Sequence, residues 1–191
     1  TGIIFAIYAF FKPFQSLVIL VPYVIFRTFL IEVNSGVKLV GDLITFVVLI
    51  RLFVMNFKNW KTWFYFKPFE WAFFVFLIFG SIIGIMNGVS IAAVIFQLRT
   101  FLIMYILYYV LSRSEIPKNF LVKLAWITVF SGAILFIQGV VEKITLRTVL
   151  MPELWMYKIL SATNFVRVYG LVNNPNSLAL VMFFAIGATI F

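Results

Sequence analysis

The sequence predicts an all-α fold, a polytopic bundle of transmembrane helices, and two observations predict it. Hydrophobic residues make up 64% of the chain and charged residues only 11%, whereas a soluble domain is roughly 45–50% apolar and about 25% charged. The apolar residues also gather in runs close to the roughly 20 residues that a helix needs to cross a membrane. A soluble domain of this length could not bury so many apolar side chains, so we expect a bilayer to cover them.

Six apolar runs and one partial run predict the spans of a single transmembrane domain over residues 1–191. Residues 1–11 reach only about half the length of a span and are interpreted as the end of one. The full spans are predicted at 14–31, 37–55, 69–86, 89–111, 120–140 and 170–191. The longest polar stretch, 141–168, lies between the last two spans and is predicted to be a loop.

The basic residues predict the orientation of these spans. The net charge is +9, from 15 Lys and Arg against 6 Asp and Glu. Such a charge is typical of nucleic-acid binding, but here the basic residues stand between apolar runs, where orientation signals and anionic-lipid contacts are expected. Loops 56–68 and 112–123 are basic and two spans apart, which predicts that both face the cytoplasm. Loop 141–168 then lies outside, although it is also basic.

The residue types exclude several chemistries. The chain has no Cys and no His, so it has neither disulfides nor thiolate metal sites, and it lacks the commonest general base. It contains no Walker motif, no dinucleotide-binding glycine pattern and no nucleophile elbow. The chemistry of soluble enzymes is therefore not expected.

The main candidate site is the segment Arg167–Asn176, at the predicted outer start of the last span. Gly170 and Pro175 disfavour a regular helix here. One interpretation is structural, a loop that leads into a helix N-terminus capped by Asn. The other is an anion site, because a helix N-terminus offers free N–H groups and Arg167 adds a fork suited to phosphate. The residues themselves leave both interpretations open.

A second candidate is Arg99, near the middle of its predicted span. A charge at that depth costs about 2.5–3.5 kcal/mol on insertion scales, so the side chain must pair or face water. Arg99 is interpreted either as part of a structural pair, with Asp42 or a backbone carbonyl, or as a second phosphate ligand. Gln97 and Gln138 are interpreted as interhelical hydrogen-bond partners.

The residues Arg167, Gly170, Asn174, Pro175 and Asn176 form the pattern Arg-x-x-Gly-x-x-x-Asn-Pro-Asn. This pattern, which follows a polar loop and opens an apolar span, resembles the O-antigen ligase and polymerase family of bacterial membrane proteins. The close match covers the ten-residue segment alone, and the ladder of spans resembles that family's N-terminal half by hydropathy only. The resemblance implies a GT-C-like helical fold in the bacterial cytoplasmic membrane.

The resemblance also implies an activity. Members of the family transfer a glycan from undecaprenyl diphosphate to an acceptor hydroxyl, on lipid A core or on another glycan, at the outer membrane face. On this resemblance Arg167 is the catalytic residue that stabilises the leaving diphosphate. Arg99, Gly170, Asn174 and Asn176 then bind the substrate or shape its site. Since arginines neutralise the charge, no metal and no cofactor is implied, and the partners are the bilayer, the lipid-linked glycan and its acceptor, with no nucleic acid.

The family uses a further external loop later in its chain, with another Arg and often a His. This chain begins at Thr1 and ends at Phe191 inside an apolar run, so we expect it to be a piece of a longer protein that is not active alone. Ligase and polymerase both remain open. The alternative function is a secondary transporter of a small anion such as bicarbonate, because carriers also build sites from broken helices, and a structural membrane subunit is a third interpretation.

Overall fold

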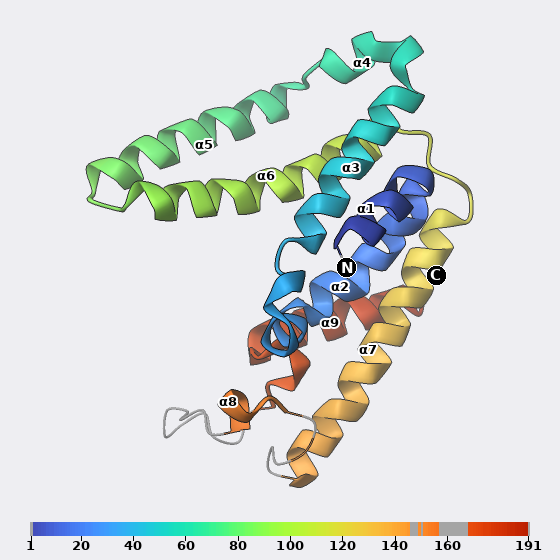
Figure 1. Cartoon of the computed structure of the whole chain (residues 1–191), viewed down its shortest axis with the longest axis vertical. Coiled ribbons are helices and arrows are strands. Elements are labelled where there is room, and N and C mark those ends of the chain that lie inside the picture. The colour runs from blue at the N-terminus through green and yellow to red at the C-terminus, as the bar shows by residue number, and fades with distance from the viewer. Residues whose placement is uncertain (1, 146–148, 150, 157–167, 191) are drawn as a thin grey trace. The chain divides into compact units, whose positions relative to one another are not determined.

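The computed structural model describes residues 2–145, 149, 151–156 and 168–190. All regular structure within these residues is helical, with no strand (Figure 1), which confirms the all-α class. The chain divides into two compact units, the first made of residues 1–44 and 117–191 and the second of residues 45–116. The single transmembrane domain stays a prediction.

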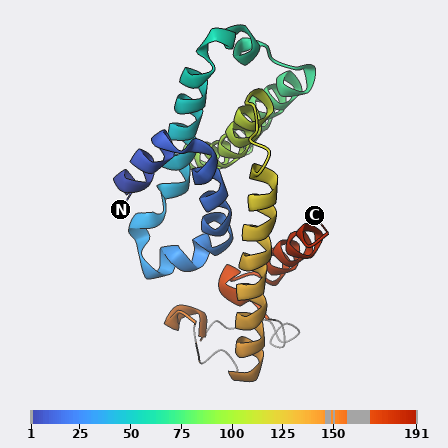
Figure 2. The same ribbon diagram turned by 90° about the vertical axis from the view of Figure 1, so that its right-hand side faces the viewer.

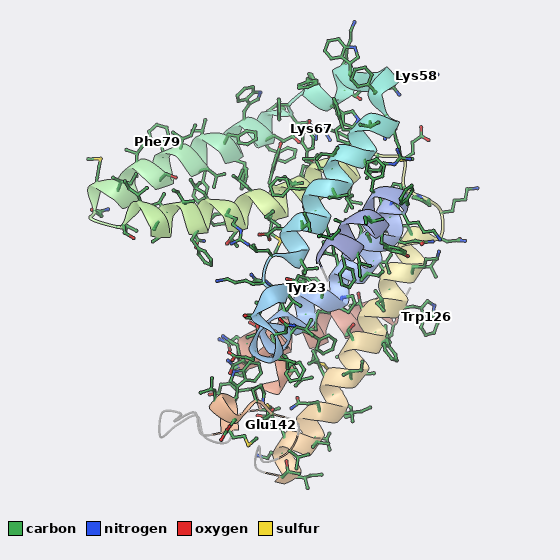
Figure 3. The ribbon with its side chains drawn as sticks, viewed as in Figure 1. Tyr23, Lys58, Lys67, Phe79, Trp126 and Glu142 are labelled. Atoms are coloured by element: carbon green, nitrogen blue, oxygen red, sulfur yellow. The ribbon has the colours of Figure 1, made fainter. Side chains whose placement is uncertain are left out.

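Among the residues that the structure describes, four helices are long and apolar enough to cross a membrane: α2 (Pro13–Val33), α5 (Pro68–Met86), α6 (Ile91–Arg113) and α7 (Phe120–Thr145). Large apolar side chains point outward from them, for example Phe79 on α5, 61% exposed, and Trp126 on α7, 71% exposed (Figure 3). Such exposed apolar surface marks a face that contacts a membrane or another protein, and together with the length and composition of these helices it supports a membrane protein.

The other predicted spans form shorter helices, so the predicted number of spans is not confirmed. The partial run forms α1 (Gly2–Phe11), the run 37–55 forms α3 (Val40–Met55), and the last run forms α9 (Pro175–Ala188). Their lengths are 10, 16 and 14 residues, against the roughly 20 that a span needs.

The helix α3 begins late because the chain first turns a tight corner. Asn34 ends α2, and its side chain caps the short 3-10 turn Ser35–Val37 (η1). The Tyr23 hydroxyl donates a hydrogen bond to the last carbonyl of that turn at 2.7 Å. The Tyr23 ring lies so close to Gly41 that a Cβ there would be 2.5 Å from a ring carbon. This corner takes up the first residues of the predicted span.

The helix α7 continues to Thr145, past the predicted end at residue 140. Gln138 and Glu142 lie on its buried face, 4% and 2% exposed. The predicted loop begins at residue 141, but the buried Glu142 belongs to the packed face of the helix. Within the predicted loop 141–168 the structure also describes α8 (Glu153–Met156).

In the first unit α7 packs against both α2 and α9, and Figure 2 shows α9 lying against α7. They pack tightly at Gly132, where an added Cβ would collide with the Cβ of Ala185. Small residues allow such close packing of helices within membranes. This contact fixes α9, and therefore the turn that precedes it, beside α7.

In the second unit α5 and α6 form a hairpin closed by the turn at Asn87-Gly88, where Gly88 has a φ of 81°. The opposite end carries the short helices η2 (Phe57–Asn59), which contains Lys58, and α4 (Trp60–Phe64), which is followed by Lys67 (Figure 3). Arg113, at the end of α6, hydrogen-bonds the carbonyl of Tyr65 there at 2.8 Å. Loop 56–68 and the start of loop 112–123 therefore share one end of the hairpin, as their predicted common side requires.

Candidate functional site

The described part of the predicted site is a turn that leads into α9. Gly170–Val172 form a single 3-10 turn (η3), and both Gly170, with φ 59°, and Asn173, with φ 58°, are left-handed. Asn174 is the N-cap of α9, since its Oδ1 accepts hydrogen bonds from the backbone N–H groups of Asn176 at 2.9 Å and Ser177 at 3.3 Å. This is the capped helix start that the structural interpretation expects.

The N–H groups at the start of α9 are already in use. Pro175 has none, the next two bond to the Asn174 side chain, and the N–H of Leu178 bonds to the Asn174 carbonyl at 2.9 Å. The anion interpretation relied on free N–H groups at this terminus. An anion held here would therefore depend on a cationic side chain, and the predicted one is Arg167.

Glu142 holds the turn before α9 against α7. Its carboxylate is buried and accepts the backbone N–H of Gly170 at 2.7 Å and that of Tyr169 at 3.0 Å. Hydrogen bonds to an ionised acceptor are roughly twice as strong as neutral ones. Figure 3 shows Glu142 toward the end of α7. A single carboxylate thus anchors a turn that lies 28 residues further along the chain.

A cleft of about 680 Å³ lies beside this turn, within the first unit. Its volume is within the range of about 300–1,000 Å³ that is usual for ligand sites. It is bounded by α2, α7, the segment 151–153 and η3. Its lining residues are Phe29, Glu32, Val33, Ile134, Ile137, Gln138, Val141, Met151, Pro152, Glu153 and Leu171. The polar members of this set are two carboxylates and one amide.

The Gln138 amide lies between the cleft and the turn. Its Nε2 is 3.8 Å from the sulfur of Met151, which is a weak acceptor. Its Oε1 is buried and has no hydrogen-bond partner among the described residues. A Cβ on Gly170 would lie 3.5 Å from that oxygen. A buried oxygen without a donor costs roughly 1–3 kcal/mol, so this position favours a ligand that supplies one.

The structure brings together three of the predicted site residues, since Gly170, Asn174 and Asn176 belong to one turn and helix start. Arg167, the predicted catalytic residue, lies outside the described residues. Arg99 is half-buried on α6 of the second unit, and its predicted role in substrate binding stays a prediction.

Protein-family models, curated proteins and solved structures were compared with this chain. None of them matches it. The function is therefore argued from the residues and the geometry of the site.

Sequence reasoning missed Glu142 and gave Gln138 only an interhelical role. A signal for both is present in the helical spacing, because Ser131, Leu135, Gln138 and Glu142 recur every three or four residues and are all buried. A carboxylate that continues a buried stripe must have a buried partner, since an unpaired charge there is costly. The spacing does not reveal that the partner is the turn at Gly170.

The first unit offers hydrogen-bond acceptors for a ligand. Its described residues contain no group of three acidic side chains that could hold a metal ion. The cleft can receive hydrogen bonds through Glu32, Gln138 and Glu153, and its other walls are apolar. Such an arrangement can orient a ligand that donates hydrogen bonds.

The second unit has its own buried charges. Arg113 bonds both carboxylate oxygens of Glu70, at 2.8 and 2.7 Å, and its guanidinium carbon lies 3.9 Å from the ring centroid of Tyr109. Glu70 also accepts the backbone N–H of Lys67 at 2.6 Å. We call Arg113 and Glu70 the clasp. Arg113 also bonds the carbonyl of Tyr65. The clasp therefore joins loop 56–68 to the hairpin, and we interpret it as structural.

Proposed function

We propose that this chain belongs to a membrane enzyme of the O-antigen ligase or polymerase type. It transfers a glycan from undecaprenyl diphosphate to an acceptor hydroxyl at the outer face of the bacterial cytoplasmic membrane. The observation that carries the proposal is the segment Arg167–Asn176, whose sequence pattern resembles that family. The anchoring of its described part beside a ligand-sized cleft supports the proposal.

The chemistry needs a fixed cation at the leaving group. Cleavage of the bond between sugar and diphosphate moves negative charge onto the phosphate, and a preorganised cation stabilises that charge in the transition state. Arg167 stands three positions before Gly170 in the sequence, and Glu142 fixes Gly170. An anchored turn reduces the reorganisation needed when the charge develops. In this proposal Asn174 shapes the start of α9, and Asn176 contacts the donor.

The decisive variant is Arg167→Ala in the protein expressed from its own gene in its own host. We expect loss of glycan transfer, seen as a shortened envelope glycan profile and accumulation of the undecaprenyl-diphosphate-linked donor, with unchanged membrane insertion. Arg167→Lys should rescue poorly, because an ammonium lacks the planar fork of a guanidinium. Lys143→Ala, an exposed basic residue of the same predicted loop, is the matched control and should keep full transfer.

Full transfer by Arg167→Ala would remove the site assignment. An unchanged glycan profile together with lost anion uptake would instead favour the transporter. The proposed sidedness has its own test, because the chain contains no Cys and single cysteines can be labelled on a clean background. Lys143→Cys should react with a membrane-impermeant maleimide added outside, and Lys61→Cys should not; the reverse pattern contradicts the proposed sidedness.

A further inference from the structure

We propose that the cleft between α2, α7 and η3 binds the neutral, hydroxyl-bearing part of a ligand. This proposal rests on the proposed function. It assigns binding of the acceptor sugar to the cleft and binding of the diphosphate to Arg167. The assignment is argued from the polar atoms of the cleft, from its buried amide and from its walls.

The charged groups of the cleft are acceptors. Glu32 on α2 and Glu153 on α8 both line it, and neither Lys nor Arg is among its described lining residues. An ionised carboxylate can only accept hydrogen bonds, and two of them repel a phosphate. Sugar hydroxyls donate hydrogen bonds without bringing negative charge, so they suit this lining and a diphosphate does not.

The Gln138 amide is an independent observation that points to a ligand. Its side chain is 4% exposed and lines the cleft, and its Oε1 lacks a donor among the described residues. A hydroxyl bound in the cleft supplies that donor. The same amide lies beside Gly170, so the hydroxyl it binds is held next to the turn that continues from Arg167 in the sequence.

The remaining walls are apolar and suit the carbon face of a ring. Phe29 and Leu171 line the cleft, and the Phe29 ring packs edge-on against buried Trp155 with a centroid distance of 6.4 Å. Sites with a few polar atoms on apolar walls are the usual form of small-molecule pockets. A compact sugar ring fits both properties, whereas an ammonium ion would use the carboxylates and leave the apolar walls without a partner.

The test compares three probes that share one alkyl chain: octyl β-glucoside, octyl phosphate and octylammonium. Their dissociation constants are measured by saturation-transfer NMR on the protein in lipid nanodiscs, with empty nanodiscs subtracted. We expect octyl glucoside to bind at least about fivefold more tightly than the other two. Gln138→Leu should weaken glucoside binding about fivefold, the effect of one lost hydrogen bond. The matched control Gln97→Leu, an exposed amide of α6, should change nothing.

A second pair of variants tests whether the ligand occupies the volume of the cleft. Ile134→Trp fills the cleft and should abolish glucoside binding, whereas Phe136→Trp, on the same helix but not among the lining residues, should leave it intact. Tighter binding of phosphate or ammonium than of glucoside overturns the proposal, and so does equal glucoside binding by Gln138→Leu and the unaltered protein.

The two proposals fail separately. If glucoside binds as described while Arg167→Ala keeps full transfer, Arg167 is not the catalytic residue and the cleft assignment stands. If glucoside does not bind while Arg167→Ala is inactive, the cleft assignment falls and the proposed function stands.

Discussion

Glu70 and Glu142 are both buried carboxylates, 0% and 2% exposed, yet they have different surroundings. Glu70 bonds the guanidinium of Arg113, and this clasp joins a loop to a helix hairpin. Glu142 bonds the backbone of the turn at Tyr169 and Gly170, which borders a cleft. The comparison teaches that a buried acid in this chain does not itself mark a functional site. The segment that the acid holds decides its role.

Their positions on the helices differ as well. Glu70 lies in the first turn of α5, where the helix dipole favours a negative charge. Glu142 lies near the end of α7, where the dipole disfavours it. Glu142 therefore depends more on the N–H groups it accepts. A carboxylate at the unfavourable end of a helix dipole is expected where its hydrogen bonds position another segment of the chain.

The largest expected effect is in the clasp. Arg113→Leu leaves the charge of Glu70 buried without its partner, and we expect the free energy of unfolding to fall by about 3–5 kcal/mol. The measurement is denaturant unfolding in mild detergent micelles. Arg113→Leu combined with Glu70→Leu should recover most of the loss, and Glu115→Gln, an exposed acid nearby, should stay within about 0.5 kcal/mol of the unaltered protein. A loss below about 1 kcal/mol in Arg113→Leu would show that the clasp is not structural.

Glu142→Ala sharpens the comparison. It leaves the buried N–H of Gly170 without this acceptor, at about 1–3 kcal/mol, and that of half-buried Tyr169, at about 1 kcal/mol, so we expect a total loss of about 2–4 kcal/mol. It should also weaken octyl glucoside binding, because Leu171 of the released turn lines the cleft, whereas Arg113→Leu should not. The control is Lys143→Ala, which changes the exposed residue next to Glu142. Equal loss of glucoside binding in Glu142→Ala and Arg113→Leu would contradict the proposed difference between Glu142 and Glu70, the partner of Arg113.

Gly170→Ala tests the conformation of the anchored turn. Its left-handed φ of 59° costs a residue with a Cβ about 1–2 kcal/mol, and the new Cβ would lie 3.1 Å from a methyl carbon of Leu178. Thermal unfolding should show that loss. Gly187→Ala on α9 meets nothing within 4 Å and should be neutral or slightly stabilising, since Ala favours a helix. If both variants behave alike, the turn is not strained as described.

The smallest effect separates the two asparagines of the predicted site. Asn174→Ala removes the cap of α9, and we expect a loss of about 1 kcal/mol. Asn176 contributes its backbone N–H to that cap, so Asn176→Ala should hardly change the unfolding transition. Glycan transfer should nevertheless fall in Asn176→Ala if its amide contacts the donor. A stable Asn176→Ala protein with full transfer would assign the Asn-Pro-Asn segment to the helix start alone.

Local signals predict most of the membrane helices. The sequence predicts spans at 69–86 and 89–111, and the structure has α5 at Pro68–Met86 and α6 at Ile91–Arg113. Pro68 opens the first helix and the Asn87-Gly88 turn closes it, so neighbouring residues set the ends. The cap by Asn174 is predictable for the same reason.

The rest of the site depends on contacts between distant parts of the chain. Glu142 meets Gly170, and the cleft needs α2 and α7 together with the segment 151–153. Spacing along one helix indicates that Glu142 is buried, but it does not identify what the carboxylate bonds. The late start of α3 likewise depends on Tyr23, a residue from the preceding helix.

The corner at Tyr23 and Gly41 has an evolutionary consequence. The ring fills the space that any side chain at position 41 would need, so position 41 cannot take a larger residue while Tyr23 is present. Among homologues, a residue larger than Gly at position 41 should occur only with a small residue at position 23. Such covariation would reveal the pair from an alignment alone, and Tyr23→Ala is the substitution most suited to rescue Gly41→Ala.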